Sequence, residues 1–194
     1  MSPRTPQQYQ EIREEKKNAI MQVALELFAN EGYHSTSISK IAQKANMSKG
    51  LMYNYFESKE ALLKDIIFSG VDNLMQFFDP NHDGILTKEE LLHFIKQSFK
   101  MVKENLTYWR LYFSLMLQSP VMELFGNDLW KMFDPFFQTL YDYFVREGYE
   151  DPKAEVHFFQ SLLDGVGMSY VTDPENYPID AVEKKIISIY SKKC

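Results

Sequence analysis

Apolar residues recur at steps of three and four along almost the whole chain, and this spacing places them on one face of an α-helix. The clearest stripe lies between Tyr9 and Ala29, and it consists of Ile12, Ile20, Val23, Ala24, Leu27 and Phe28. We find no alternation of apolar and polar residues of the kind typical of a half-buried strand. Only 8 Gly and 8 Pro occur among 194 residues, so positions for turns are few. The sequence therefore predicts an all-α fold.

Helix-breaking and capping residues divide this pattern into about nine helices in two parts. We expect a disordered tail over residues 1–8, a helix-turn-helix domain over 9–57 and a larger helical domain over 58–194. In the larger domain a long helix is expected from Pro120 to Glu147, with Pro135 as a candidate kink. The expected N-caps of the second, third and fourth helices are Thr36 or Ser37, Ser48 and Ser58.

Charge and composition limit the kinds of function that this protein can have. The net charge is −6, yet residues 1–70 carry nine Lys and Arg against eight Asp and Glu, so the acidity lies in the rest of the chain. The sequence shows no secretory signal pattern and no apolar run of the ~20 residues that a membrane span needs, so we expect a cytoplasmic protein without a membrane partner. The single cysteine, Cys194, excludes an internal disulfide. Because we find no nucleophile elbow, phosphate loop or triad, we expect no enzyme.

Residues 37–56 have the spacing of a helix-turn-helix, two short helices around a tight turn at Asn46. The partial positive charge and free N–H groups at the start of the second helix suit phosphate, and Lys49 adds a full charge there. The hydroxyl of Tyr53 is suited to a phosphate contact. The side chains expected to be exposed on this helix are those of Ser48, Lys49, Met52, Tyr53 and Tyr55. The alternative is a helical hairpin that touches no DNA.

The run from Ala24 to Leu63 resembles the DNA-binding signature of the TetR family of bacterial transcriptional regulators. It matches the patterns ALELFxxxGY, TSIxxIAxxA and SKGxxYxxFxSKExL, which cover about the first third of the chain. The resemblance implies a phosphate contact for Ser37, base-edge contacts for Lys49, Gly50 and Met52, and backbone contacts for Tyr53 and Lys59. It also implies a core built from Phe28, Tyr33, Ile41, Ala42 and Phe56. Glu57 and the pair Asn54–Tyr55 depart from the family pattern, which puts phosphate attraction and the preferred operator in doubt.

The same resemblance implies how the whole protein works. A homodimer binds a palindromic double-stranded DNA operator, and a small apolar or aromatic effector in the larger domain releases it, as in a repressor. The last two helices, at about 154–171 and 179–191, are expected to form the dimer interface, where Gly165 and Gly167 allow close approach. The candidate effector pocket consists of Tyr108, Trp109, Tyr112, Met116, Phe133 and Phe137. The alternative from another class is a DNA-bound architectural factor without an effector.

Residues 79–90, with the sequence DPNHDGILTKEE, match the calcium-binding loop of an EF-hand. The candidate Ca²⁺ ligands are the side chains of Asp79, Asn81, Asp83 and Glu90 and the carbonyl of Ile85. Gly84 permits the sharp turn, and Leu86 and Thr87 occupy the eighth and ninth positions. The other interpretation is a helix connector rich in turn and capping residues. A calcium-responsive regulator is therefore an alternative function, although no cofactor is required and a single loop makes a calcium buffer an unfavourable interpretation.

Overall fold

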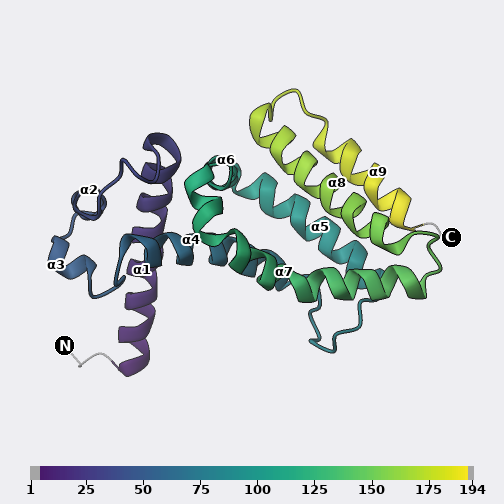
Figure 1. Ribbon diagram of the computed structural model, residues 1–194, viewed down its shortest axis with the longest axis horizontal. Coiled ribbons are helices and arrows are strands. Elements are labelled where there is room, and N and C mark those ends of the chain that lie inside the picture. The colour runs from purple at the N-terminus through teal and green to yellow at the C-terminus, as the bar shows by residue number, and fades with distance from the viewer. Residues whose placement is uncertain (1–4, 192–194) are drawn as a thin grey trace. The chain divides into compact units, whose positions relative to one another are not determined.

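The computed structural model describes residues 5–191, and every regular element in this range is a helix. Figure 1 shows the helices in chain order, and their arrangement confirms the all-α prediction. Among the described residues, none of the helices is both long and apolar enough to span a membrane. The helices are α1 (Pro6–Glu31), α2 (Ile38–Lys44), α3 (Lys49–Met52), α4 (Lys59–Met75), α5 (Lys88–Glu104), α6 (Leu106–Met116), α7 (Ser119–Arg146), α8 (Pro152–Thr172) and α9 (Ile179–Ser191).

The first helix begins earlier than the sequence pattern predicts. The Oγ1 atom of Thr5 accepts a hydrogen bond from the N–H of Gln8, and the Gln8 side chain accepts one from the N–H of Thr5. This reciprocal capping box, together with Pro6 at the first helical position, starts α1 before the apolar stripe does. Residues 6–8 are therefore helical rather than part of a tail. At the other end, Gly32 has a φ of 88° and ends the helix.

The chain forms two compact units, and their division differs from the expected boundary after residue 57. Unit 1 consists of Met1–Ser69 and Ser114–Leu124, and unit 2 of Gly70–Phe113 and Phe125–Cys194. The first half of α4 belongs to unit 1 because it buries one side of its apolar stripe there. The apolar side chains of unit 1 that are at most 2% exposed are those of Ile20, Ala24, Leu25, Phe28, Ile41, Ala42, Met52, Phe56, Leu62, Leu63, Ile66, Ile67, Leu115 and Val121.

Unit 2 contains a core in which aromatic rings are prominent. Within it α5, α8 and α9 pack side by side, as Figure 1 shows. Phe94 contacts Phe78 edge-to-face at 5.2 Å between ring centroids, and Phe159 contacts Tyr190 in the same way, also at 5.2 Å. Such edge-to-face pairs add stability beyond the burial of their area. Helix α7 continues across Pro135 as one element.

Candidate nucleic-acid interface

Helices α2 and α3 form the predicted helix-turn-helix, and serine side chains start both of them. The Oγ atom of Ser37 accepts a hydrogen bond from the N–H of Lys40 at 3.2 Å, and that of Ser48 accepts one from the N–H of Leu51 at 3.1 Å. Between the two helices Asn46 adopts a φ of 55°, a left-handed conformation that Asn tolerates better than most residues. These contacts confirm the N-caps at Ser37 and Ser48.

The first turn of α3 offers an exposed face to a partner. Ser48, Lys49 and Gly50 are exposed, and the side chain of Tyr53 is 47% exposed. Nothing lies within 4 Å of the position that a Cβ atom on Gly50 would take, so the backbone there is open to a close approach. Asn54, which departs from the family pattern, is exposed on this surface, and so is Leu51, which no sequence pattern indicates. Ser37, at the start of α2, is exposed as well.

Met52 lies in the core of unit 1, so the prediction that it contacts base edges is wrong. Its side chain is 0% exposed, and that of Phe56, four residues later, is 2% exposed. Two residues four apart lie on one face of a helical turn, and here that face is turned inward. Helix α3 also ends at Met52 rather than near Tyr55, and the N–H of Tyr55 instead donates to the Met52 carbonyl in a turn.

Tyr55 is half-buried, and a residue of α1 covers its ring. The guanidinium carbon of Arg13 lies 5.1 Å from the centroid of the Tyr55 ring. Arg13 also donates a hydrogen bond to the carbonyl of Asn54 at 2.7 Å. A cation beside the last carbonyls of a helix is favourable, so Arg13 stabilises the end of α3. A DNA contact by Tyr55 stays a prediction.

The ammonium of Lys59 lies against backbone carbonyls within unit 1. It donates to the carbonyl of Tyr33 at 2.8 Å and to that of Thr36 at 2.9 Å, and it lies 4.3 Å from the centroid of the Tyr33 ring. Burial lowers the pKa of Lys59, since it disfavours the charged form. Its contacts hold the loop between α1 and α2, and a phosphate contact by Lys59 stays a prediction.

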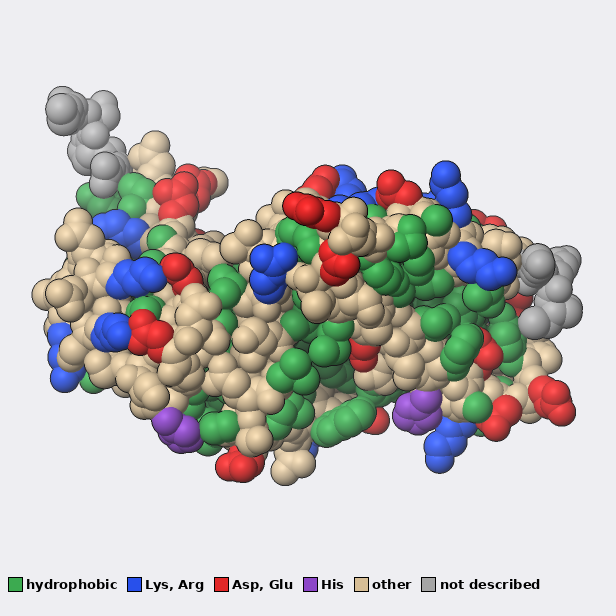
Figure 2. Space-filling view, turned by 90° about the horizontal axis from the view of Figure 1, so that it is seen from above, with side chains coloured by type: hydrophobic (Ala, Val, Ile, Leu, Met, Phe, Trp, Pro, Cys, Tyr) green, Lys and Arg blue, Asp and Glu red, His purple; other side chains and the backbone are tan. Residues whose placement is uncertain are grey.

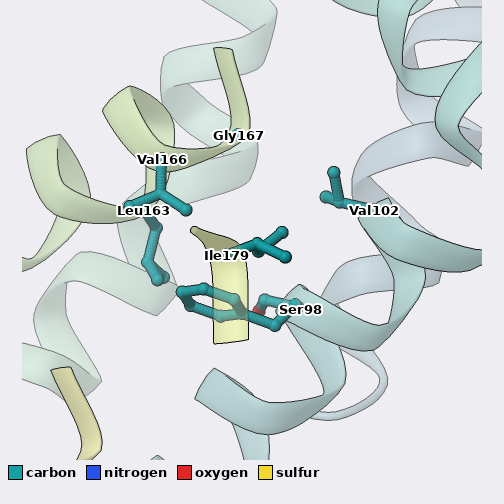
Figure 3. Close-up of a pocket in the computed structure, with 7 residues that line it drawn as sticks. Ser98, Val102, Leu163, Val166, Gly167 and Ile179 are labelled. Carbon is teal, nitrogen blue, oxygen red and sulfur yellow. The ribbon is translucent and has the colours of Figure 1, made fainter. Parts of the chain in front are cut away.

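Unit 2 contains a small apolar pocket between α5, α8 and the start of α9. Figure 3 shows its lining side chains, which converge on a hollow of about 40 Å³. The hydroxyl of Ser98 donates to the Phe94 carbonyl in its own helix at 2.8 Å, so the pocket wall is apolar in character. The lining residues are Ser98, Phe99, Val102, Leu163, Val166, Gly167 and Ile179.

The candidate effector residues from the sequence lie elsewhere, and ring contacts join them in two sets. Tyr108, Trp109 and Tyr112 form one set with centroids 5.4–6.0 Å apart, and Phe133 lies 5.9 Å from Phe137 in the other. Burial raises the pKa of Tyr112. Met116 belongs to unit 1, whereas the other five belong to unit 2. None of the six lines the pocket of Figure 3, and their role in binding an effector stays a prediction.

The loop from Asp79 to Glu90 makes its own hydrogen bonds. The Oδ2 atom of Asp79 accepts from the N–H of Gly84 at 2.9 Å, and the Glu90 carboxylate accepts from the N–H and hydroxyl of Thr87, each at 2.8 Å. Thr87 and Glu90 thus form a capping box that starts α5. Within the described residues no group of three or more His, Cys, Asp or Glu side chains is placed to hold a metal ion. These contacts fit a helix connector, and calcium binding stays a prediction.

Helices α8 and α9 expose apolar side chains. In Figure 2, which views the molecule from the side on which these two helices lie in Figure 1, hydrophobic side chains gather between charged ones. Phe158 is 48% exposed, Met168 39% and Ile189 38%. Gly167 was expected to allow close approach in a dimer interface, but it lies against Phe113 of α6 in the same chain. A Cβ atom on Gly167 would lie 2.9 Å from the Phe113 ring. No atom lies within 4 Å of the corresponding position on Gly165.

Comparisons with known proteins agree with this geometry. Residues 20–66 match the family of bacterial regulatory proteins called the tetR family. The uncharacterized HTH-type transcriptional regulator YuxN of Bacillus subtilis (strain 168) is 51% identical over 53 residues, which is 27% of this chain and 18% of that protein. The biofilm operon icaADBC HTH-type negative transcriptional regulator IcaR of Staphylococcus epidermidis is 25% identical over 136 residues, which is 70% of each chain.

The fold comparison extends over nearly the whole chain. FadR of Bacillus subtilis, solved in complex with stearoyl-CoA, superposes with a TM-score of 0.66 at 18% identity, and the match covers 91% of this chain and 98% of that one. At this identity the likeness concerns the fold. Both named relatives, YuxN and IcaR, are described as HTH-type transcriptional regulators. The match at residues 20–66 coincides with the helix-turn-helix and its supporting core, so this N-terminal part of the chain is similar to the tetR family of bacterial regulatory proteins.

Proposed function

We propose that the protein is a homodimeric transcriptional repressor that binds a palindromic operator and is released from it by a small apolar effector in unit 2. The observation that carries the proposal is the exposed first turn of α3, in a domain that matches the tetR family. Because its partner is chromosomal DNA, we place its action in the cytoplasm.

In this proposal α3 enters the major groove with its N-terminal turn forward. Lys49 and the exposed backbone at Gly50 approach base edges, and Tyr53 donates its hydroxyl to a phosphate. The N–H groups at the starts of α2 and α3, at Ser37 and Ser48, lie near phosphates and complement their charge. Repression is the proposed direction because IcaR, which matches this chain over 70% of its length, is named as a negative regulator.

A second copy of the chain is the proposed partner for α8 and α9. Exposed Phe158, Met168 and Ile189 lie on these helices, and burying them against the same surface of a second chain removes apolar area from water. Two recognition helices related by a twofold axis bind half-sites one helical turn apart, about 34 Å centre to centre. An operator bound by such a symmetric pair of helices is palindromic, because its two half-sites are related by the same twofold axis.

The effector is proposed to be a molecule with an apolar chain. The pocket between α5, α8 and α9 is lined almost wholly by apolar side chains, and a protein of the same fold, FadR, was solved with stearoyl-CoA. A hollow of about 40 Å³ is far smaller than the about 300 Å³ at which ligand pockets begin, so binding requires the helices to move apart. An effector that prefers such an opened state shifts the population away from the DNA-binding state.

The proposal is tested by fluorescence anisotropy with DNA from upstream of the protein's own gene, at two salt concentrations and with random DNA as competitor. We expect saturable binding that weakens steeply with salt and resists random DNA, followed by release when stearoyl-CoA is added. Specific binding without release by any acyl compound favours the effector-free architectural factor. Binding that random DNA abolishes at equal concentration contradicts the proposal.

Calcium is a second candidate effector, supported by one observation. Among the described residues, the Oδ1 atom of Asp79 is buried without a hydrogen-bond partner, and a cation at that atom would compensate its charge. Glu90 would have to leave the capping box with Thr87 to complete the site. Calorimetry with millimolar Ca²⁺ tests this, and the absence of any binding heat removes calcium from the proposal.

A further inference from the structure

One face of α1 leads from the core of unit 1 to the edge of the helix-turn-helix. Ile20 and Ala24, both 0% exposed, occupy this face inside the core. Arg13 and Lys17 continue it toward the start of the helix, because steps of three and four residues keep side chains on one face. In Figure 1 the start of α1 extends beyond α2 and α3. The face that is apolar in the core is therefore positively charged where it leaves the core.

The two cations of this face have different partners. The ammonium of Lys17 pairs with the carboxylate of Asp65 at 2.7 Å, so its charge is compensated within unit 1. The guanidinium of Arg13 lies over the Tyr55 ring, 5.1 Å from its centroid, and one of its N–H groups donates to the Asn54 carbonyl at 2.7 Å. Both partners of Arg13 are uncharged, and both lie directly after α3. Arg13 is also exposed.

The charge of Arg13 is not compensated by a carboxylate. Among residues 5–191, no Asp or Glu side chain forms an ion pair with it. Glu11 and Glu15 lie on the opposite side of α1, because two positions turn a helix by about 200°. A guanidinium has five N–H donors on one planar fork, and the Asn54 carbonyl accepts from only one of its nitrogens. Arg13 therefore keeps donors for a further, negatively charged acceptor.

The surface next to Arg13 is the one that is proposed to meet DNA. Asn54, to which Arg13 is bonded, is exposed, and the neighbouring Tyr53 is 47% exposed. Glu57 is exposed three residues after Asn54, and its negative charge repels phosphate. A guanidinium binds a phosphate through two parallel N–H bonds and neutralises its charge. Arg13 is thus suited to supply, at this end of α3, the phosphate attraction that Glu57 opposes.

We propose that Arg13 of α1 binds a phosphate of the DNA backbone beside the end of α3 and offsets the charge of Glu57 there. Arg13 lies outside residues 20–66, which match the tetR family, so the match assigns it no role. The inference rests on the proposed function and adds to it a contact from a helix that carries none of the other proposed DNA contacts. A phosphate contact strengthens binding to any DNA and fixes the register in which α3 enters the groove.

The test is the salt dependence of binding by the wild-type protein, Arg13→Gln and Arg13→Lys, measured by fluorescence anisotropy with DNA from upstream of the protein's own gene and with random DNA. Each phosphate contact contributes about 0.9 to the slope of log K against log salt concentration, so a dimer that loses two contacts should have a slope smaller by about 1.8. The affinity ratio of wild type to Arg13→Gln should therefore fall about twelvefold between about 50 and 200 mM salt. Arg13→Gln should also bind random DNA more weakly, because a phosphate contact does not depend on sequence. Arg13→Lys keeps the charge, so it should keep the slope and lose only the affinity that the planar fork provides.

The matched control is Lys44→Gln, which removes the same charge from unit 1 at an ammonium already paired with Glu26 at 3.0 Å, and its slope should equal that of the wild-type protein. Affinities refer to the folded fraction, which urea unfolding gives for each variant. If Arg13 only supports the end of α3 through Asn54 and Tyr55, both Arg13 variants lose affinity and keep the wild-type slope, and this result overturns the inference. A wild-type protein that binds upstream and random DNA equally well overturns the proposed function, whereas the slope on random DNA still tests Arg13, so the two failures are distinguished.

Discussion

Lys59 offers a direct way to separate support of the loop from contact with DNA. In Lys59→Met the two hydrogen bonds to the carbonyls of Tyr33 and Thr36 and the contact with the Tyr33 ring are lost. Hydrogen bonds from a charged donor contribute about 1.5 kcal/mol each, and a partly exposed cation–π contact about 0.5 kcal/mol. The substitution also removes a partly buried positive charge from the start of α4, where such a charge is unfavourable, and this gain offsets part of the loss. We therefore expect a loss of about 2 kcal/mol in the free energy of unfolding.

The assay is urea unfolding followed by circular dichroism, combined with the salt dependence of operator binding. Each phosphate contact contributes about 0.9 to the slope of log K against log salt concentration. We expect Lys59→Met to lower stability and to leave this slope unchanged. Lys49→Met, at an exposed position of α3, is the matched control with the opposite expectation: unchanged stability and weaker binding to the operator, because a base-edge contact is lost. A Lys59→Met protein with wild-type stability and a reduced slope would refute the assignment of Lys59 to the loop.

Three further substitutions test other contacts. Gly70→Ala places a Cβ atom 2.5 Å from the Tyr112 ring and should cost about 1–3 kcal/mol in thermal unfolding, and wild-type stability would show that the ring yields freely. The Cβ atom of Gly50→Ala meets no atom within 4 Å, so this substitution should raise the free energy of unfolding by about 0.5 kcal/mol. It should weaken operator binding if DNA approaches this backbone closely, and an affinity equal to that of the wild-type protein would exclude such an approach. The hydrogen bond to Glu183 raises the pKa of Lys103 above its usual 10.5. Lys103→Met should therefore lower the free energy of unfolding by about 0.5–1 kcal/mol at pH 8. The difference in stability between the two proteins should shrink as pH rises through the raised pKa, because Lys103 then loses its charge. A deficit that persists unchanged in that alkaline range would contradict the ion pair as its cause.

Local capping chemistry explains why much of the fold was predictable from the sequence. The sequence predicts Thr36 or Ser37 as the N-cap of α2 and Ser48 as that of α3, and both Ser37 and Ser48 accept the backbone hydrogen bonds of an N-cap. The start of α1 was missed because the apolar stripe begins later than the capping box of Thr5 and Gln8. Met52 was misplaced because α3 is a single turn, too short for a periodic pattern to distinguish its inner face from its outer one.

Contacts between distant parts of the chain were beyond sequence reasoning. Gln118 lies 85 residues from Tyr33, and no local pattern indicates that the two are bonded. The pocket combines residues of α5, α8 and α9 that each belong to an ordinary apolar stripe, so nothing in the stripes marks them as lining residues. The prominent Tyr and Trp residues of the sequence predict a pocket at α6 instead. There the indole N–H of Trp109 donates to the Met101 carbonyl, and its side chain is 8% exposed.

Selection of binding sites from random double-stranded DNA tests the central claim most directly, because it assumes no operator. We would incubate the wild-type protein with a random library, recover bound DNA over several rounds and sequence it, with the protein carrying Lys49→Met and Tyr53→Phe in parallel. The account predicts an enriched palindrome whose half-sites are centred one helical turn apart, and much weaker enrichment by the variant. Recovery of DNA without any common sequence, or equal enrichment by both proteins, would contradict the claim that the exposed turn of α3 recognises an operator.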